Sequence, residues 1–414
     1  MRVAVQRQPI RVPGYRFAGV TCGLKESGAR DVAVIASDVP ATAAGAFTTN
    51  RVKAAPVLLG LERLPVGTLQ AIVINSGNAN AYTGRPGLAA ARAMCAIAAR
   101  ELGIREALVV PSSTGRIGVQ LPRDRVEAGV RAACRALSPD GFYDALEGIM
   151  TTDAFPKSAV DGLVVDGREV CLAGMTKGAG MIAPRMALAT RAGRPTGHAT
   201  NLTYVMTDAA VSRAALRRAL QIALPQSFNA IVVDGDTSTN DTAIVLANGA
   251  AGTRPLTPQS RGFPAFCAAL ARVMTTLARM VVKDGEGATK VVDIRVRGAR
   301  SVRDAERVAD TIARSPLCKA AFFGNDPYMG RIVCAAGYSG AVFDPAKLDV
   351  YVDDVPVVRR GRELVAEVEE RAAAVTRRPE FTLTLHLHAG AAAAHRMASD
   401  LTVDYVRFNS AYRT

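Results

Sequence analysis

The sequence predicts an α/β fold in which layered sheets are flanked by helices. Short β-branched runs alternate along the chain with Ala-rich stretches whose apolar residues recur at helical spacing. Apolar residues make up 49% and charged residues 21% of the 414 residues, which is ordinary for a folded globular protein. The chain shows no internal repeat and no long low-complexity linker, so we expect one compact body.

The expected elements follow one another along the whole chain. The predicted strands are Asp31–Ser37, Gln70–Asn75, Ala107–Pro111, Asn229–Asp234, Ala243–Asn248, Val291–Val296, Leu348–Val352 and Phe381–His388. The predicted helices are Gly87–Leu102, Ala209–Leu224 and Pro264–Val282. Because each helix carries its apolar residues on one face, we interpret all three as core-facing helices rather than as cofactor-binding segments.

The charge is strongly basic but evenly distributed. Lys and Arg number 51 against 37 Asp and Glu, a net charge of +14 at neutral pH. These basic residues are spread over the sequence, there is no Trp, and no basic tract carries interleaved aromatic residues that would stack on nucleobases. We therefore interpret the charge as a solvated surface and expect no nucleic acid partner.

Several features favour a cytoplasmic protein without a membrane span. The longest apolar candidate, Ala268–Val282, is interrupted by Arg272 and Arg279 and is shorter than the roughly 18 residues of a spanning helix. The N-terminal segment lacks the apolar region of a secretory signal. The seven cysteines are odd in number and form no CxxC pair, which is typical of free thiols in a reducing compartment.

The common catalytic and metal-binding motifs are weak or absent. His386 and His388 would share one face of a strand, but no Cys or carboxylate stands at a supporting spacing, so we expect no metal site. The segment Gly178–Ala183 fits a relaxed dinucleotide fingerprint, yet Pro184 follows and no helical pattern opens there. No G-x-S-x-G nucleophile elbow is present.

Small polar residues instead cluster in Gly-containing segments where predicted strands end. These segments are Asn75–Asn80, Pro111–Gly118 and Asp234–Thr242. Each one alone has the composition of an ordinary turn. Three of them at strand ends favour a site, and the glycines of Pro111–Gly118 are suited to present backbone N–H groups to a developing oxyanion.

Together with further motifs, these segments make the chain resemble the ornithine acetyltransferase family, also called the bifunctional glutamate N-acetyltransferases. The resemblance runs from Ala43 to Thr414. The motifs that carry it are Ala43–Arg51, Asn75–Asn80, Ser112–Gly118, Thr151–Lys157, Lys177–Pro184, Thr200–Ala209, Asp234–Thr242, Asp284–Lys290, Gly324–Arg331 and Asn409–Thr414. Their number and order make a chance match improbable.

The resemblance implies a precursor that cleaves its own backbone between Ala199 and Thr200, as in N-terminal-nucleophile enzymes. Thr200 would then be the nucleophile, and its new α-amine, with an ordinary pKa of about 8, would serve as the general base. The products would be an N-terminal chain of residues 1–199 and a C-terminal chain of residues 200–414. Both chains would form one catalytic unit, assembled as a heterotetramer of two copies of each.

The resemblance also implies roles for other residues. Thr114 through its hydroxyl and Gly115 through its backbone N–H would form the oxyanion hole. The positions that match the family's substrate-binding residues are Thr151, Lys177, Thr200, Glu286, Asn409 and Thr414. Thr152 is an alternative to its neighbour Thr151. A lysine and a glutamate suit a substrate that carries both a carboxylate and an ammonium group.

The implied reaction moves an acetyl group from N-acetylornithine to glutamate through an acyl-Thr200 intermediate, by a ping-pong mechanism, in arginine biosynthesis. It requires no cofactor, and the use of acetyl-CoA as a second donor stays open. Three alternatives also stay open. They are a paralogue acting on another acyl-amino acid in specialised metabolism, an N-terminal-nucleophile amidase or peptidase, and a non-catalytic binding protein.

Two segments depart from the family pattern. About twelve extra residues, Leu188–Ala199, precede Thr200, and they contain a second Ala-Thr pair at Ala189 and Thr190 that competes as a cleavage site. Their Gly, Pro and Arg content is typical of an exposed loop. At the second departure, Tyr328-Met329 replaces a pair that is usually Asn-Trp in the family.

Overall fold

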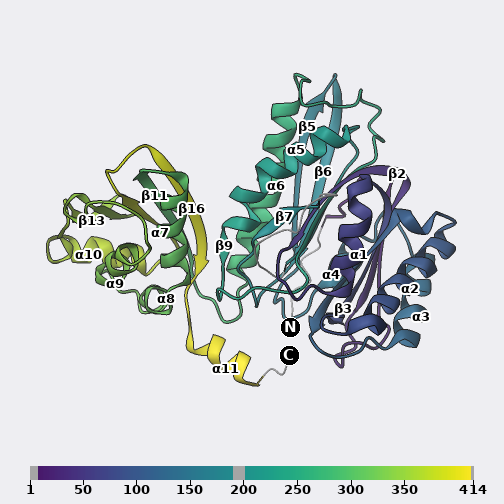
Figure 1. The fold of residues 1–414 in the computed structure, drawn as a ribbon, viewed down its shortest axis with the longest axis horizontal. Coiled ribbons are helices and arrows are strands. Elements are labelled where there is room, and N and C mark those ends of the chain that lie inside the picture. The colour runs from purple at the N-terminus through teal and green to yellow at the C-terminus, as the bar shows by residue number, and fades with distance from the viewer. Residues whose placement is uncertain (1–7, 190–200, 412–414) are drawn as a thin grey trace.

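The computed structural model describes residues 8–189 and 201–411 and has two lobes, each built on one β-sheet with helices packed against it (Figure 1). The sheet of the larger lobe has nine strands, and that of the smaller lobe has seven. The larger sheet contains β1 (Tyr15–Val20), β2 (Val32–Thr48), β3 (Thr68–Asn78), β4 (Val109–Arg116), β5 (Lys157–Val165), β6 (Arg168–Lys177), β7 (Met186–Leu188), β8 (Leu202–Thr207) and β10 (Thr242–Ala247). The smaller sheet contains β9 (Ile231–Val232), β11 (Val291–Ala299), β12 (Asp349–Val352), β13 (Val355–Arg359), β14 (Arg362–Glu363), β15 (Glu380–His386) and β16 (Ala392–Ser399).

The larger sheet contains strands from residues 8–189 and strands from the part of the chain that follows residue 201. Its main path runs β4-β3-β2-β10-β8-β6-β5, while β1 and β7 pair with β2. Strands β8 and β10 are parallel to each other and lie between β2 and β6, with which they pair in antiparallel fashion. The two parts of the chain are therefore joined by continuous backbone hydrogen bonding.

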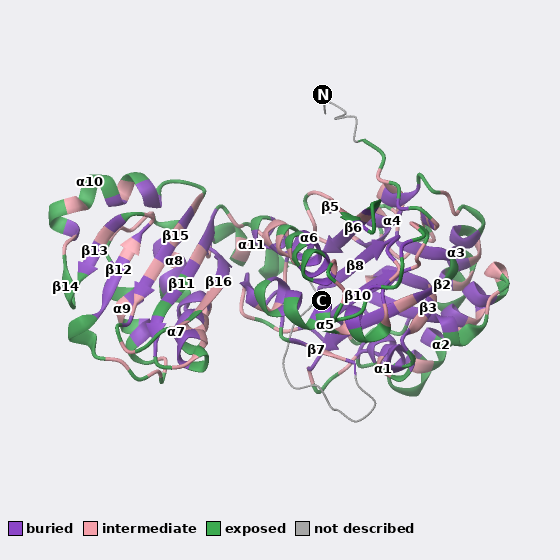
Figure 2. Ribbon diagram, turned by 90° about the horizontal axis from the view of Figure 1, so that it is seen from above, coloured by how far each residue is buried: buried purple, intermediate pink, exposed green. Residues whose placement is uncertain are grey.

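Helices cover the sheets and leave their outer faces to solvent (Figure 2). The helices of the larger lobe are α1 (Ala55–Arg63), α2 (Gly84–Leu102), α3 (Arg123–Arg135), α4 (Phe142–Ile149), α5 (Arg213–Ala223) and α6 (Phe263–Lys283). Those of the smaller lobe are α7 (Val302–Arg314), α8 (Pro316–Phe323), α9 (Gly330–Gly337) and α10 (Val365–Thr376). The final helix, α11 (Val403–Ala411), leaves the smaller lobe and extends towards the larger one (Figure 1).

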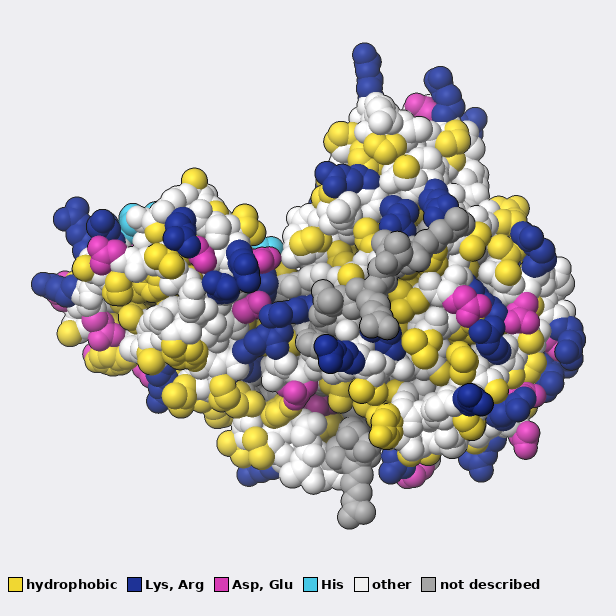
Figure 3. Space-filling view, in the orientation of Figure 1, with side chains coloured by type: hydrophobic (Ala, Val, Ile, Leu, Met, Phe, Trp, Pro, Cys, Tyr) yellow, Lys and Arg dark blue, Asp and Glu magenta, His cyan; other side chains and the backbone are white. Residues whose placement is uncertain are grey.

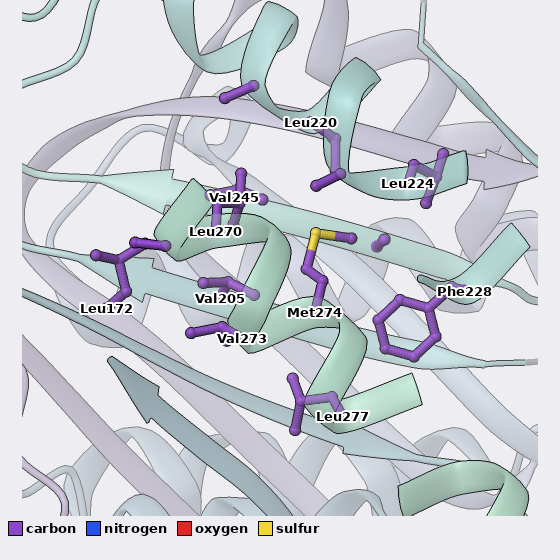
Figure 4. Packing of buried hydrophobic residues seen from close by; sticks show 14 of the residues in the cluster. Leu172, Val205, Leu220, Leu224, Phe228, Val245, Leu270, Val273, Met274 and Leu277 are labelled. Carbon is purple, nitrogen blue, oxygen red and sulfur yellow. The ribbon is translucent and has the colours of Figure 1, made fainter. Parts of the chain in front are cut away.

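Helix α6 packs mainly against β5 and β6, at one end of the larger sheet, with α5 beside it. In Figure 4, Leu270, Val273, Met274 and Leu277 of α6 lie among Leu172, Val205, Leu220, Leu224, Phe228 and Val245. Truncation of one such buried leucine to alanine costs about 2 to 5 kcal/mol. Among the described residues, α6 is the one helix long and apolar enough to cross a membrane, but most of that stretch is buried inside the lobe.

Strand β9 joins the two lobes. Its residues follow α5 in the chain, yet they pair in parallel with β16 of the smaller sheet, Ile231 with Met397 and Val232 with Ala398. The loop from Val233 to Asp241 then returns to β10 of the larger sheet. This loop therefore lies where the two lobes meet.

The structure confirms the α/β class, and every predicted helix and strand is present with shifted ends. One expectation is wrong in detail. Most of the segments Asn75–Asn80 and Pro111–Gly118 are not turns, because β3 continues through Asn78 and β4 through Arg116. The parallel pairing of Ser76 with Thr114 and of Gly77 with Gly115 satisfies backbone groups that a turn would leave to solvent.

The surface charge is mixed. On the face shown in Figure 3, Lys and Arg side chains lie over both lobes and alternate with Asp and Glu. Most of the ion pairs are between partly exposed side chains, such as Arg16 with Asp38 and Arg272 with Asp161. Pairs of this kind each contribute about 0 to 1 kcal/mol to stability.

Candidate active site

The backbone at Thr114 and Gly115 is shaped by the neighbouring strand. Gly115 has a φ of +128°, a conformation that side chains rarely adopt. A Cβ atom built on Gly115 would lie 2.6 Å from the backbone nitrogen of Asn78. Glycine is therefore required here, both for its backbone angle and for the close approach of β3 and β4.

Asn240 connects the three polar segments that the sequence places at strand ends. Its Nδ2 donates to the carbonyl of Ala79 over 2.6 Å and to the carbonyl of Ser113 over 2.8 Å, while its Oδ1 accepts from the hydroxyl of Thr239 over 2.5 Å. The buried amide thus holds the loop before β10 against the ends of β3 and β4. Replacement of Asn240 would therefore remove a hydrogen bond from each of two carbonyls in the buried region.

One pocket brings together most of the predicted site residues. Its lining includes Thr114, Gly115, Thr151, Thr152, Lys177, Glu286 and Asn409, together with Ala79, Ile117, Gly180, Met181, Ser238 and Asn240. These residues come from the ends of β3, β4 and β6, from the loops that follow α4, α6 and β9, and from α11. Convergence of polar groups from so many separate segments is typical of a ligand site.

Lys177 supplies a buried positive charge. Its side chain lies at the end of β6 and is 3% exposed, and its Nζ donates to Thr114 Oγ1 over 3.3 Å. Burial lowers the pKa of Lys177, while the carboxylate of Asp153 opposes that shift. The Lys177 carbonyl accepts from Asn201 Nδ2 over 2.8 Å, which fixes the strand end beside the start of β8.

A buried ion network supports the pocket from behind. The ammonium of Lys157 lies 2.6 Å from Asp153 and 2.5 Å from Asp284, and all three side chains are almost completely buried. Burial alone would raise the pKa of Asp153, but Lys177 and Lys157 together lower it to about 2. Asp153 also accepts from the backbone N–H groups of Thr151 over 2.8 Å and Gly178 over 2.7 Å. The network therefore fixes the turn that carries Thr151.

Glu286 supplies the negative charge of the pocket. Its backbone N–H donates to the carbonyl of Ala179 over 3.0 Å, and its Oε2 accepts from Asn409 Nδ2 over 3.0 Å. A Cβ atom at Gly180 would lie 2.5 Å from the Glu286 carboxylate carbon, so any larger residue there would displace this side chain from its present position. Asn409 is the residue through which α11 reaches the pocket.

Asp234 holds the other wall. Its carboxylate accepts from the backbone N–H groups of Met181 over 2.6 Å and Ile182 over 2.9 Å. Burial raises the pKa of Asp234 to about 6, although these hydrogen bonds favour its charged form. Met181 has a φ of +57°, so the carboxylate stabilises a strained turn at the pocket.

Four of the predicted residues lie outside the described residues. They are Ala199 and Thr200, the predicted cleavage pair, the competing Thr190, and Thr414. Asn201, which follows Thr200 in the chain, is described and is completely buried beside Lys177.

Sequence reasoning gave no role to Asp153, Lys157, Asp234, Asn240 or Asp284. All five lie inside motifs that carry the family resemblance, so the sequence already marks these positions. Their roles could not be predicted, because each residue acts through a partner far away in the sequence.

The two candidate metal ligands lie in the smaller lobe. The rings of His386 and His388 are 3.8 Å apart between centroids, and His388 Nε2 lies 3.0 Å from Asp349 Oδ2. Across residues 8–189 and 201–411 there is no group of three or more His, Cys, Asp and Glu side chains arranged to hold a metal ion. Tyr328 and Met329, the second departure from the family pattern, are also absent from the pocket lining in this part of the chain.

Fold and pocket first indicate a class of protein. An α/β enzyme whose pocket is lined by a threonine hydroxyl, an adjacent glycine, a buried cation and a carboxylate suits acyl transfer on a small charged substrate. Comparison with known proteins then gives the family. The family model described as ArgJ matches residues 16–414. The chain is 50% identical to the arginine biosynthesis bifunctional protein ArgJ of Symbiobacterium thermophilum over 97% of each chain, and 46% identical to that of Geobacter sulfurreducens over 98% of this chain and 100% of the relative.

The chain belongs to the ArgJ family. The prediction of an acyltransferase of arginine biosynthesis is confirmed. Two solved structures align with about half of this chain. The arginine biosynthesis bifunctional protein ArgJ of Bacillus halodurans is 36% identical, with a TM-score of 0.48 over 50% of this chain and 96% of its own. The ornithine acetyltransferase of Mycobacterium tuberculosis, solved with ornithine, is 38% identical, with a TM-score of 0.40 over 44% of this chain and 98% of its own.

Proposed function

We propose that this enzyme transfers the acetyl group of N-acetylornithine to glutamate through an acetyl ester on Thr200. The main support for this proposal is the pocket in which Thr114, Gly115, Lys177 and Glu286 converge. It contains hydrogen-bond donors for an oxyanion, a cation for a carboxylate and a carboxylate for an ammonium group.

The first half-reaction forms the acyl-enzyme. The α-amine of Thr200 takes the proton from its own Oγ as the oxygen attacks the acetyl carbonyl, and the carbonyl oxygen becomes an oxyanion. The hydroxyl of Thr114 and the N–H of Gly115 stabilise that charge. The carbon–nitrogen bond then breaks, and ornithine leaves with the proton that the α-amine had taken.

The second half-reaction reverses these steps with a different amine. The neutral amino group of glutamate attacks the ester carbonyl, and the same oxyanion forms. The attacking nitrogen loses a proton to the α-amine, the bond between the carbonyl carbon and Thr200 Oγ breaks, and Oγ takes that proton as N-acetylglutamate departs. No cofactor enters either half-reaction.

Charge matching assigns the substrate groups. Lys177 binds the α-carboxylate of the amino acid, because it is a buried cation next to Thr114. Glu286, held by Asn409, binds the side-chain ammonium of N-acetylornithine. Thr151, or its neighbour Thr152, and the C-terminal Thr414 complete the substrate site in this proposal.

Self-cleavage between Ala199 and Thr200 would create the nucleophile. The resulting chains, residues 1–199 and 200–414, would remain one unit because β8 and β10 of the second chain pair with β6 and β2 of the first. We place the assembly in the cytoplasm as a heterotetramer, a location that fits the seven free cysteines. Size-exclusion chromatography with light scattering tests the assembly.

The function is tested with N-acetylornithine that carries a labelled acetyl group. With glutamate present, the label should appear in N-acetylglutamate, and double-reciprocal plots at several glutamate concentrations should be parallel, as a ping-pong mechanism requires. Release of labelled acetate without transfer would instead indicate an amidase. Parallel assays with acetyl-CoA determine whether it serves as a second donor.

A further inference from the structure

A second pocket adjoins the candidate active site. It is lined by Thr21, Lys25 and Ser27 of the loop between β1 and β2, by the end of α4, and by Thr151 and Asp153. Thr151 lines both pockets, so they are neighbours on the two sides of the turn that carries it.

Lys25 is the cation of this second pocket that lacks an ion pair. Its Nζ donates to the carbonyl of Arg30, and no carboxylate of the described residues lies within 4.0 Å of it. Arg30, by contrast, is paired with Asp144 at 2.8 Å and Glu147 at 2.9 Å. Since an ammonium has three donors, Lys25 retains two for another partner.

The loop holds Lys25 in place. The fully buried carboxylate of Asp31 accepts from the backbone N–H groups of Cys22 over 2.6 Å, Leu24 over 2.6 Å and Lys25 over 3.2 Å. Burial lowers the pKa of Lys25 to about 8; the carboxylates of Asp31 and Asp153 oppose that shift, and the charge of Lys177 adds to it. Asp153 lines the second pocket together with Lys25, and its carboxylate accepts from the backbone N–H of Gly178, the residue after Lys177, over 2.7 Å.

The two proposed substrates carry different numbers of carboxylates, and a single lysine cannot bind both carboxylates of glutamate. N-acetylornithine carries one carboxylate and one ammonium, which suit Lys177 and Glu286. Glutamate carries two carboxylates. Its second carboxylate would be repelled by Glu286 unless another cation receives it, because the proposed function already assigns Lys177 to the α-carboxylate.

We propose that Lys25 determines acceptor specificity by binding the side-chain carboxylate of glutamate, while Lys177 binds the α-carboxylate. This inference rests on the proposed function. The second pocket would then be a subsite for dicarboxylate acceptors, and the donor N-acetylornithine would not occupy it. Lys25 would contact the substrate only in the second half-reaction.

The test separates the two half-reactions in the processed enzyme. Lys25→Met should acylate with N-acetylornithine at a rate within about two-fold of wild type, measured as ornithine released in a single turnover. Its KM for glutamate should rise about ten-fold or more, with kcat little changed, because one charge-assisted hydrogen bond is lost. Lys25→Arg, which keeps the charge, should recover much of the affinity. Lys347→Met, at an exposed position in the smaller lobe, is the matched control and should behave as wild type.

The outcomes distinguish this inference from the proposed function. If Lys25→Met acylates normally and its KM for glutamate is unchanged, the Lys25 subsite is wrong and the proposed function stands. If the wild-type enzyme forms no acyl intermediate, the proposed function fails, and the inference fails with it. If the melting temperature shows that Lys25→Met is destabilised, Lys25→Arg and Lys25→Gln are compared instead. An equal KM for glutamate in those two variants would overturn the role of the charge.

Discussion

Lys177 donates a hydrogen bond from Nζ to the hydroxyl oxygen of Thr114 over 3.3 Å, so the buried cation of β6 is in direct polar contact with the end of β4. An ammonium has no acceptor, and Thr114 must therefore use an oxygen lone pair in this contact. Its own proton stays free for another partner. In the proposed mechanism that partner is the oxyanion.

Replacement of Thr114 tests the oxyanion role. Thr114→Ala should lower kcat by roughly a hundred-fold or more, with a smaller effect on KM, because the donor acts mainly in the transition state. The rate is measured on processed enzyme, with the processed fraction read from a denaturing gel. Thr114→Ser keeps the hydroxyl and should retain most activity. Wild-type turnover in processed Thr114→Ala would exclude the role.

Gly115→Ala should destabilise the protein and abolish activity. The added Cβ would meet the backbone of β3 and impose a strained φ, which together should cost at least about 2 kcal/mol. The melting temperature and the free energy of unfolding measure this loss. Gly337→Ala is the matched control, because no atom lies within 4 Å of the added Cβ at the end of α9. Equal stability of both variants would refute the packing argument.

The prediction for Asp153 concerns acid stability. Its pKa in the folded protein, about 2, lies below its ordinary value, so its stabilising contribution is present above about pH 4 and is lost as the pH falls towards 2. At neutral pH, Asp153→Asn should therefore lower the free energy of unfolding by about 3 to 5 kcal/mol, because it leaves buried Lys157 with one fewer partner. In urea denaturation, the difference in free energy of unfolding between wild type and Asp153→Asn should become smaller below about pH 4. A difference that stays constant with pH would indicate a purely steric effect.

Glu286→Gln should discriminate between the donor and the acceptor. Loss of the carboxylate removes the partner of the donor's ammonium, so kcat/KM for N-acetylornithine should fall by about ten-fold or more. The affinity for glutamate should not weaken, because a repulsive charge is removed. Glu363→Gln, on the exposed strand β14, serves as the control. Equal losses for both substrates would mean that Glu286 acts on the shape of the pocket rather than on charge.

The sequence predicted the fold class and most elements because periodicity is a local property. Thr114, Gly115, Thr151, Lys177, Glu286 and Asn409 could be named in advance only through the family resemblance. Their convergence depends on a sheet order in which β10 and β8 lie between β2 and β6, which no local pattern encodes.

The supporting residues escaped prediction for the same reason. Lys157 and Asp284 form their ion pair across 127 positions, and Asn240 reaches Ala79 across 161. Each looks like an ordinary polar residue of a turn until the chain is folded. The extension of β3 and β4 was missed because Gly and Asn, which usually end strands, are here accommodated by close parallel pairing.

The central claim is that Thr200 becomes the acetyl-bearing N-terminal residue of the second chain. It is tested most directly by mass spectrometry of the C-terminal chain after incubation with labelled N-acetylornithine. The N-terminal peptide should read Thr-Asn-Leu-Thr-Tyr, carry one labelled acetyl group on the Thr200 side chain, and lose it when glutamate is added. An N-terminus that reads Thr-Arg-Ala-Gly, or an active chain that remains uncut, would contradict this claim.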